Sequence, residues 1–231
     1  MINRLYHIFE PMKLHELFED EERSILSVMG KQPDHCPGDF YCGGNNLTSL
    51  EGAPSSVGGE FSCSRNNLTS LEGAPSSVSG NFYCYDNNLT SLKGAPSSVG
   101  GEFSCSRNNL TSLEGAPSSV GGDFHCSDNK LTSLEGAPSS VGGKFYCYDN
   151  KLTSLHNIHK QIKHVGRIAD FIGNPITSHV LGLLMIDGLK EVNLDNKEVE
   201  KIIDRHLSGD RDVFACQEEL IEAGFEDFAQ L

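Results

Sequence analysis

The chain has 231 residues, and 18 Lys and Arg against 32 Asp and Glu give it a formal net charge of −14. Such an acidic chain repels nucleic acids and anionic membranes unless basic residues cluster locally, and its sequence contains no Lys/Arg run. The longest apolar run, residues 180–186, is too short to cross a bilayer, and residues 1–22 lack the apolar stretch of a signal peptide. We therefore expect a cytoplasmic protein without nucleic-acid or membrane partners.

Residues 1–37 precede the repetitive part of the chain and are interpreted as an N-terminal helical cap. Within them, residues 13–29 place apolar side chains at helical spacing around an acidic cluster at 19–22. This spacing predicts one or two short amphipathic helices.

A 21-residue period dominates the middle of the chain, and it is marked by six cysteines: Cys42, Cys63, Cys84, Cys105, Cys126 and Cys147. The unit N-x-L-T-S-L-x-G-A-P-S-S-V-x-G-x-F-x-C-x-x surrounds them, which predicts a solenoid of stacked coils. In Phe-x-Cys, apolar and variable residues alternate, as in a short strand with Phe and Cys directed inward. A cysteine column of this kind predicts core packing rather than disulfides or a metal site.

The rest of each unit is expected to complete a coil. The asparagine after each strand, Asn45 in the first unit, predicts a column of buried amides that bond to the loops. The return path contains Gly and Pro, so we expect it to run extended and polyproline-like, with Leu47, Leu50, Ala53 and Val57 facing inward.

Phe40-x-Cys42-x-x-Asn45-x-Leu47 and its copies resemble the leucine-rich-repeat signature L-x-L-x-x-N-x-L. The short return path resembles the extended-convex repeats of bacterial effectors, and the L-T-S-L-E-G-A-P segment resembles repeat proteins encoded by tailed phages. This resemblance implies a phage or bacterial origin, a host-cytoplasmic location and a parallel sheet whose strands form a concave face.

The repeat array is assigned to residues 38–176, as six regular units and a degenerate seventh. In the seventh unit His159 replaces Pro, and Asn150 and Asn174 lie 24 residues apart. Residues 177–231 are predicted to form an acidic C-terminal helical cap, with helices at 178–186, 197–207 and 213–223. Cys216 is expected on the buried side of the last helix, at helical spacing from Phe214, Leu220 and Ile221.

Strand residues that alternate with Phe and Cys are expected to face solvent, and they include five of the six tyrosines. Tyrosine is frequent at interface hot spots, because it combines a large contact area with few rotatable bonds. The predicted partner-binding residues are Tyr41, Tyr83, Tyr85, His125, Tyr146, Tyr148, Arg65, Arg107, Asp86, Asp128, Asp149, Glu60 and Glu102. The alternative is that repeat duplication spread these residues without selection for binding.

These features favour a non-enzymatic module that binds a protein. A structural or virion-associated adhesin is the alternative, and an enzyme built on the C-terminal helices is a third possibility without a recognisable catalytic constellation. His125 has no candidate nucleophile beside it in the sequence, and the Thr48 column is interpreted as turn-supporting rather than ice-binding. No cofactor or metal is predicted, and the identity of the partner and the oligomeric state stay open.

Overall fold

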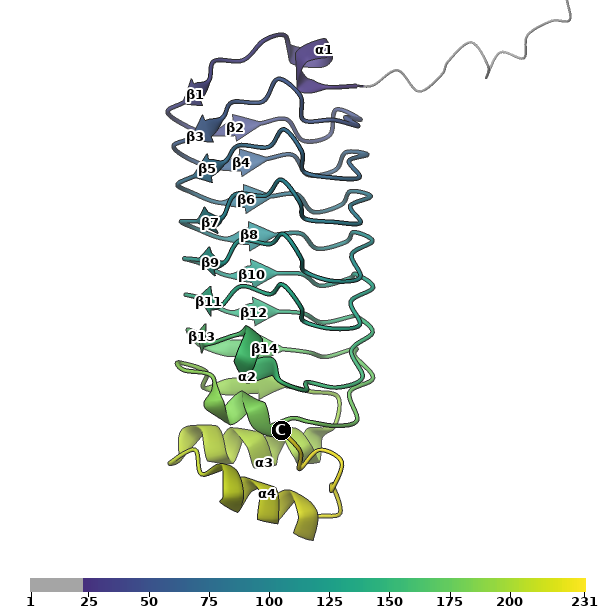
Figure 1. Cartoon of the computed structure of the whole chain (residues 1–231), viewed down its shortest axis with the longest axis vertical. Helices are drawn as coiled ribbons and strands as arrows, with labels where there is room; N and C mark the ends of the chain where they lie inside the picture. Colours follow the sequence, from purple (N-terminus) through teal and green to yellow (C-terminus); the bar gives the residue numbers. More distant parts are fainter. Residues whose placement is uncertain (1–22) are drawn as a thin grey trace, which may run out of the picture.

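In a computed structural model, which describes residues 23–231, the chain forms a parallel β-solenoid whose coils stack along the long axis of the molecule (Figure 1). Each regular 21-residue repeat makes one coil with two short strands. Because neighbouring strands of each sheet belong to successive coils, the hydrogen bonds that stabilise the sheets run between coils.

The larger sheet of the described region has eight strands in the order β15-β14-β12-β10-β8-β6-β4-β2. From β2 to β12 its parallel register pairs the phenylalanine of one coil with that of the next, as in Phe82 and Phe103. We number the coils by these strands. Coils 1–8 contain β2 (Phe40–Tyr41), β4 (Phe61–Ser62), β6 (Phe82–Tyr83), β8 (Phe103–Ser104), β10 (Phe124–His125), β12 (Phe145–Tyr146), β14 (Ile168–Asp170) and β15 (Glu191–Asn193).

The return path differs from the polyproline-like expectation, because its Ser-Val pair forms a strand in each coil. These strands make a second parallel sheet, which has seven strands within residues 23–231. The β-branched valine faces the core and the extended backbone bonds to the adjacent coil, so the local Pro and Gly do not prevent pairing. The strands are β1 (His35–Cys36), β3 (Ser56–Val57), β5 (Ser77–Val78), β7 (Ser98–Val99), β9 (Ser119–Val120), β11 (Ser140–Val141) and β13 (His164–Val165).

The core consists of identical side chains stacked in columns between the two sheets. Phenylalanine rings of successive coils have centroids 5.1 Å apart at Phe61–Phe82 and 5.3 Å apart at Phe82–Phe103. The expected Leu, Val and Cys columns are buried with them, whereas the alanines are only partly buried and the prolines beside them are buried. Burial of each leucine contributes roughly 1.5–3 kcal/mol.

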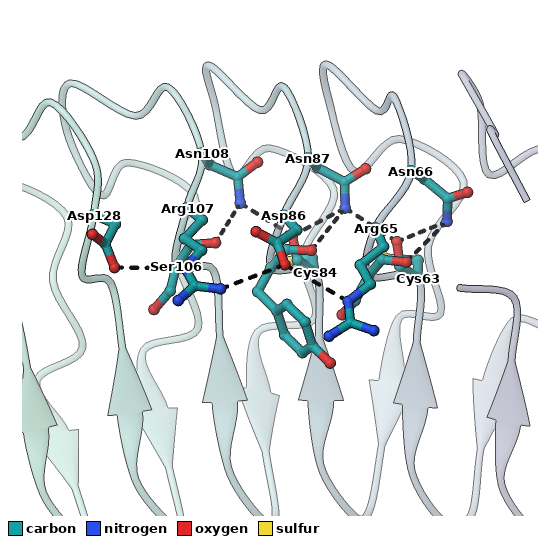
Figure 2. A network of polar contacts seen from close by, with 12 residues as sticks. Cys63, Arg65, Asn66, Cys84, Asp86, Asn87, Ser106, Arg107, Asn108 and Asp128 are labelled. Carbon is teal, nitrogen blue, oxygen red and sulfur yellow. Dashed lines mark hydrogen bonds and ion pairs between the residues drawn. The ribbon is translucent and has the colours of Figure 1, made fainter. Parts of the chain in front are cut away.

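The predicted asparagine column forms a ladder of hydrogen bonds between coils (Figure 2). Asn87 Oδ1 accepts from Leu68 N of the preceding coil at 3.0 Å, and its Nδ2 donates to Cys63 O at 3.1 Å and Cys84 O at 3.2 Å. The same bonds recur at Asn66, Asn108, Asn129 and Asn150. One side chain therefore satisfies backbone groups of two coils.

Coil 7 contains the three extra residues of the degenerate unit. The short helix α2 (Ile158–Gln161) takes the place of the Gly-Ala-Pro segment, and Ile158 and Ile162 remain in the core. The Asn column continues at Asn174, whose Oδ1 accepts from Leu152 N at 3.0 Å. Strand β15, which extends the sheet by one more coil, lies in a segment for which the sequence predicted no strand.

Beyond coil 7, residues 178–186 form a 3-10 helix, η2 (Leu181–Met185), instead of the expected longer helix. Helix α3 (Lys197–Ser208) has Asn196 as its N-cap, and α4 (Val213–Glu222) follows. Helix α3 packs against β15, and Asp204 Oδ1 accepts from Val192 N of that edge strand at 2.8 Å. Cys216 and Leu220 are buried as predicted, but the prediction that Phe214 and Ile221 share this buried side was wrong, since both are exposed.

At the other end, α1 (Ile25–Met29), with Ser24 as its N-cap, contacts the return path of coil 2 through a bond from Leu26 N to Glu51 O. The greater part of the predicted N-terminal helical segment lies outside the described residues.

Candidate functional site

The outer face of the eight-stranded sheet displays the side chains that alternate with the buried phenylalanines and cysteines. Tyr41 is 58% exposed, Tyr83 and Tyr146 are half-buried, and Ser104 is buried at 7% exposure. We call this surface the aromatic face and define it by Tyr41, Ser62, Tyr83, Tyr85, Ser104, His125, Tyr146 and Tyr148. The structure brings five tyrosines from three coils onto one surface.

The aromatic side chains form two clusters on this face. Tyr83 and Tyr85 lie edge to face with ring centroids 6.1 Å apart. In the second cluster, His125 stacks on Tyr146 at 4.5 Å, and Tyr146 meets Tyr148 edge to face at 6.5 Å.

Two cationic side chains of the protein itself lie over tyrosine rings of this face. The Arg65 guanidinium lies over the Tyr85 ring at 5.9 Å, and Lys144 Nζ lies over Tyr146 at 5.6 Å. The face therefore offers ring surfaces suited to cationic groups.

A row of alternating charges borders the aromatic face on one side (Figure 2). Nitrogen–oxygen distances of 3.8 Å separate Arg65 from Asp86, Asp86 from Arg107, and Arg107 from Asp128. The two arginine side chains are 72% and 66% exposed, so each pair contributes at most about 1 kcal/mol to stability.

This charged row also has an unusual backbone conformation. Arg65, Asp86, Arg107, Asp128 and Asp149 all have positive φ, between 52° and 58°, whereas the same position is glycine at Gly44 and Gly173. A left-handed residue with a Cβ costs roughly 1–2 kcal/mol. The ion pairs at best offset that strain, so stability alone does not explain why charged residues occupy the row.

The opposite border of the face has a period of two coils that the sequence interpretation missed. Asp39, Asn81 and Asp123, in coils 1, 3 and 5, each accept a hydrogen bond from the backbone N–H that follows in the next coil, at 2.8–2.9 Å. The N–H groups belong to Glu60, Glu102 and Lys144. The long side chains of these three residues therefore alternate along the border with the shorter Asp and Asn side chains. The signal was present in the sequence as short and long residues alternating in this column.

Glu102 joins the two aromatic clusters. The Tyr83 hydroxyl donates to Glu102 Oε2 at 3.4 Å, and His125 Nε2 lies 3.4 Å from Oε1. Burial raises the pKa of Glu102, with a further contribution from Asp123, and burial lowers the pKa of His125. Burial and the nearby carboxylates Glu102 and Glu60 raise the pKa of Tyr83 to about 12.

Two serine hydroxyls on this face are buried without a hydrogen-bond partner among the described residues, Ser64 and Ser127. In the parallel register each is followed in the next coil by a tyrosine, Tyr85 or Tyr148. Ser106, which is followed by Ser127, remains partly exposed. We attribute the burial of the hydroxyls to the adjacent tyrosine rings.

Within residues 23–231, no three His, Cys, Asp or Glu side chains are arranged to hold a metal ion. Burial raises the pKa of the Cys216 thiol to about 12, so this group is protonated at neutral pH and lacks the thiolate of a nucleophile. His35 Nδ1 contacts Ser56 Oγ at 2.9 Å, and the Cys36 thiol points to backbone carbonyls.

A hollow of about 340 Å³ lies on a different side of the solenoid, between the return paths of coils 6 and 7. In the regular coils a glycine such as Gly136 sits against the backbone of the preceding coil, where a Cβ would approach Glu114 N to 2.5 Å. Asn157 occupies this position in coil 7 with φ 58°. Because its side chain prevents the close approach, we attribute the hollow to this substitution.

Comparison with known proteins finds no family model that matches the chain and no significant match among curated proteins or solved structures. In the part of the chain that the structure describes, none of the helices has the length and apolar character required to cross a membrane.

Proposed function

We propose that this chain is a leucine-rich-repeat module without enzymatic activity, and that its aromatic face binds a protein. The observation on which the proposal rests is the contrast between the two sides of each strand. Phe and Cys repeat unchanged on the buried side in coils 1–6, whereas the outward positions vary and contain five tyrosines. Such a module could serve a phage or a bacterium as a factor that binds and modulates a cytoplasmic protein of the host.

Two further features support the same face. Charged residues occupy a left-handed row where the outer coils have glycine, although they bring little net stability there. The tyrosines already hold cations and imidazole at contact distance, and desolvated clusters of this composition are typical of interface hot spots.

The test is capture of binding proteins from lysate of the natural host, with identification by mass spectrometry. The wild-type protein is compared with the triple variant Tyr83→Ala, Tyr85→Ala and Tyr146→Ala. The matched control is Thr69→Ala, Thr90→Ala and Thr111→Ala, three exposed threonines in the return paths of neighbouring coils.

We expect a protein that is captured by the wild type and the control and lost with the tyrosine variant. The tyrosines are half-buried, so their loss lowers the free energy of unfolding by about 1–2 kcal/mol in total and leaves the solenoid folded. Equal capture by all three proteins, with circular dichroism confirming the fold, would refute binding through this face.

A further inference from the structure

Coil 2 interrupts the aromatic face with a small residue between two tyrosines. Ser62 lies between Tyr41 in coil 1 and Tyr83 in coil 3 in the parallel register. The Tyr41 hydroxyl donates to Asp39 in its own coil, and the Tyr83 hydroxyl donates to Glu102 on the far side. The Tyr41 hydroxyl is therefore held by its own coil and the Tyr83 hydroxyl is directed to coil 4, and Ser62 between them stays partly exposed. We call this position the coil-2 slot, formed by Tyr41, Glu60, Ser62 and Tyr83.

The spacing of the coils leaves room for one planar group in the slot. Strands of adjacent coils are about 4.8 Å apart, so two coils separate the Tyr41 and Tyr83 positions by about 10 Å. A flat group in contact with rings on both sides needs about 7–8 Å between them. On the same face His125 and Tyr146, one coil apart, stack with their centroids at 4.5 Å.

Coil 4 shows how the chain itself fills the equivalent position. Its sequence around the strand is identical, Glu-Phe-Ser-Cys-Ser-Arg, but Ser104 is buried at 7% exposure. Here Glu102 is contacted by a planar imidazole, His125, from the next coil.

In coil 2 the corresponding carboxylate is Glu60, and no imidazole of the described residues contacts it. The residue that follows it in the next coil at the His125 position is Tyr83, which bonds to Glu102 instead. Within the described residues, the Glu60 carboxylate accepts a hydrogen bond only from the Asn81 amide, at 3.2 Å.

Charge favours a cation in the slot. Asp39 and Glu60 lie at its acidic border, and both raise the pKa of the Tyr41 hydroxyl. The nearest cation in the same coil, Arg65, is directed to coil 3, where it meets Asp86 and the Tyr85 ring. A guanidinium stacks on tyrosine faces and pairs with a carboxylate in one plane, whereas an ammonium is a compact, strongly hydrated charge.

We propose that the coil-2 slot binds an arginine side chain of the protein partner, with the guanidinium between Tyr41 and Tyr83 and its charge paired with Glu60. This inference rests on the proposed function, because it names the chemistry by which the aromatic face recognises a partner.

The probe is N-acetyl-arginine amide, and its neutral analogue of the same shape, N-acetyl-citrulline amide, is the chemical control. Each is titrated to millimolar concentration into the isotope-labelled full chain, and amide chemical shifts are followed by NMR. Glu60→Gln removes the charge of the slot, and Ser62→Tyr fills it. Glu114→Gln, which changes an exposed carboxylate in the return path of coil 5, is the matched control.

We expect saturable shifts at Tyr41, Ser62 and Tyr83 with the arginine probe, at least tenfold weaker binding of citrulline, and loss of the shifts in Glu60→Gln and Ser62→Tyr. Glu114→Gln should retain them. Absence of saturable shifts at these amides, equal binding of citrulline, or retained binding in Glu60→Gln would overturn the arginine slot.

Host-lysate capture separates this outcome from a failure of the proposed function. If the tyrosine variant loses a partner that Glu60→Gln and Ser62→Tyr still capture, the aromatic face binds a protein but the arginine slot is wrong. If none of the variants loses a partner, the proposed function itself is wrong.

Discussion

At the scale of single residues, the buried asparagine illustrates how a polar side chain specifies this fold. Each Asn side chain of the ladder bonds to three backbone groups that would otherwise lack a partner at the tight turn after the strand. A buried amide is costly unless satisfied, and here the repeat supplies its partners in two coils at once. The adjacent asparagine, Asn88, is exposed on the surface and has no comparable role.

We expect Asn87→Ala to lower the free energy of unfolding by about 3–4 kcal/mol, because it leaves Leu68 N, Cys63 O and Cys84 O without their side-chain partner. Urea denaturation followed by circular dichroism gives the change. Asn88→Ala, one position away, is the control and should cost less than about 0.5 kcal/mol. Similar losses in the two variants would show that the ladder is not the source of stability.

At the scale of the element, the coil depends on glycines that allow close approach of neighbouring backbones. Gly94 has φ 96°, and a Cβ there would lie 2.4 Å from Leu71 O of the preceding coil. Both the left-handed conformation and the contact therefore require glycine. In coil 7 Asn157 takes the place of this glycine, and the hollow between the return paths of coils 6 and 7 lies beside it.

Gly94→Ala should therefore destabilise the protein by at least about 3 kcal/mol, combining left-handed strain with displacement of one coil from the next. Gly38→Ala is the control, because nothing lies within 4 Å of a Cβ at that position. Differential scanning calorimetry of both variants would measure the effect. An unchanged melting temperature for Gly94→Ala would mean that the coils tolerate separation anywhere in the array.

At the scale of the whole molecule, stacking of identical coils produces continuous columns of buried groups. Cys42, Cys63, Cys84, Cys105 and Cys126 belong to one such column, and burial raises the pKa of each thiol above its ordinary value of 9.0. Several of these sulfurs also donate to the carbonyl of the next coil, as Cys84 does to Ser104 O at 3.3 Å. All five thiols are therefore protonated in the folded state at a pH where the unfolded chain ionises.

The raised pKa of these buried thiols predicts a steep loss of stability in mild alkali. As pH rises through 9, the unfolded chain loses thiol protons while the folded chain keeps them, so the free energy of unfolding falls by about 1 kcal/mol per thiol between pH 9 and 10. Urea denaturation in reducing buffer at pH 8, 9 and 10 measures the slope, and Cys84→Ala should reduce it by the share of one thiol. A slope unaffected by this substitution would assign the alkaline loss to other groups.

The sequence by itself determined the period, the buried columns and the side of each strand that faces solvent. Those features follow from local alternation, and Phe82, Cys84 and Asn87 lie where their spacing predicts because every copy has the same neighbours. It did not determine the second sheet, since Ser77 and Val78 are too short a segment to predict a strand, and only the adjacent coil supplies their pairing. Strand β15 and the 3-10 helix η2 likewise depend on contacts at the end of the stack.

The same division holds for the candidate site. The alternation placed Tyr41, Tyr83 and Tyr146 on one face, whereas the tertiary structure decided which serine positions beside them are covered and which are exposed. Ser62 and Ser104 have identical local sequences, yet one is partly exposed and the other is buried. Their difference arises from the residues of the following coils, Tyr83 and His125, which lie 21 residues away along the chain and next to them in space.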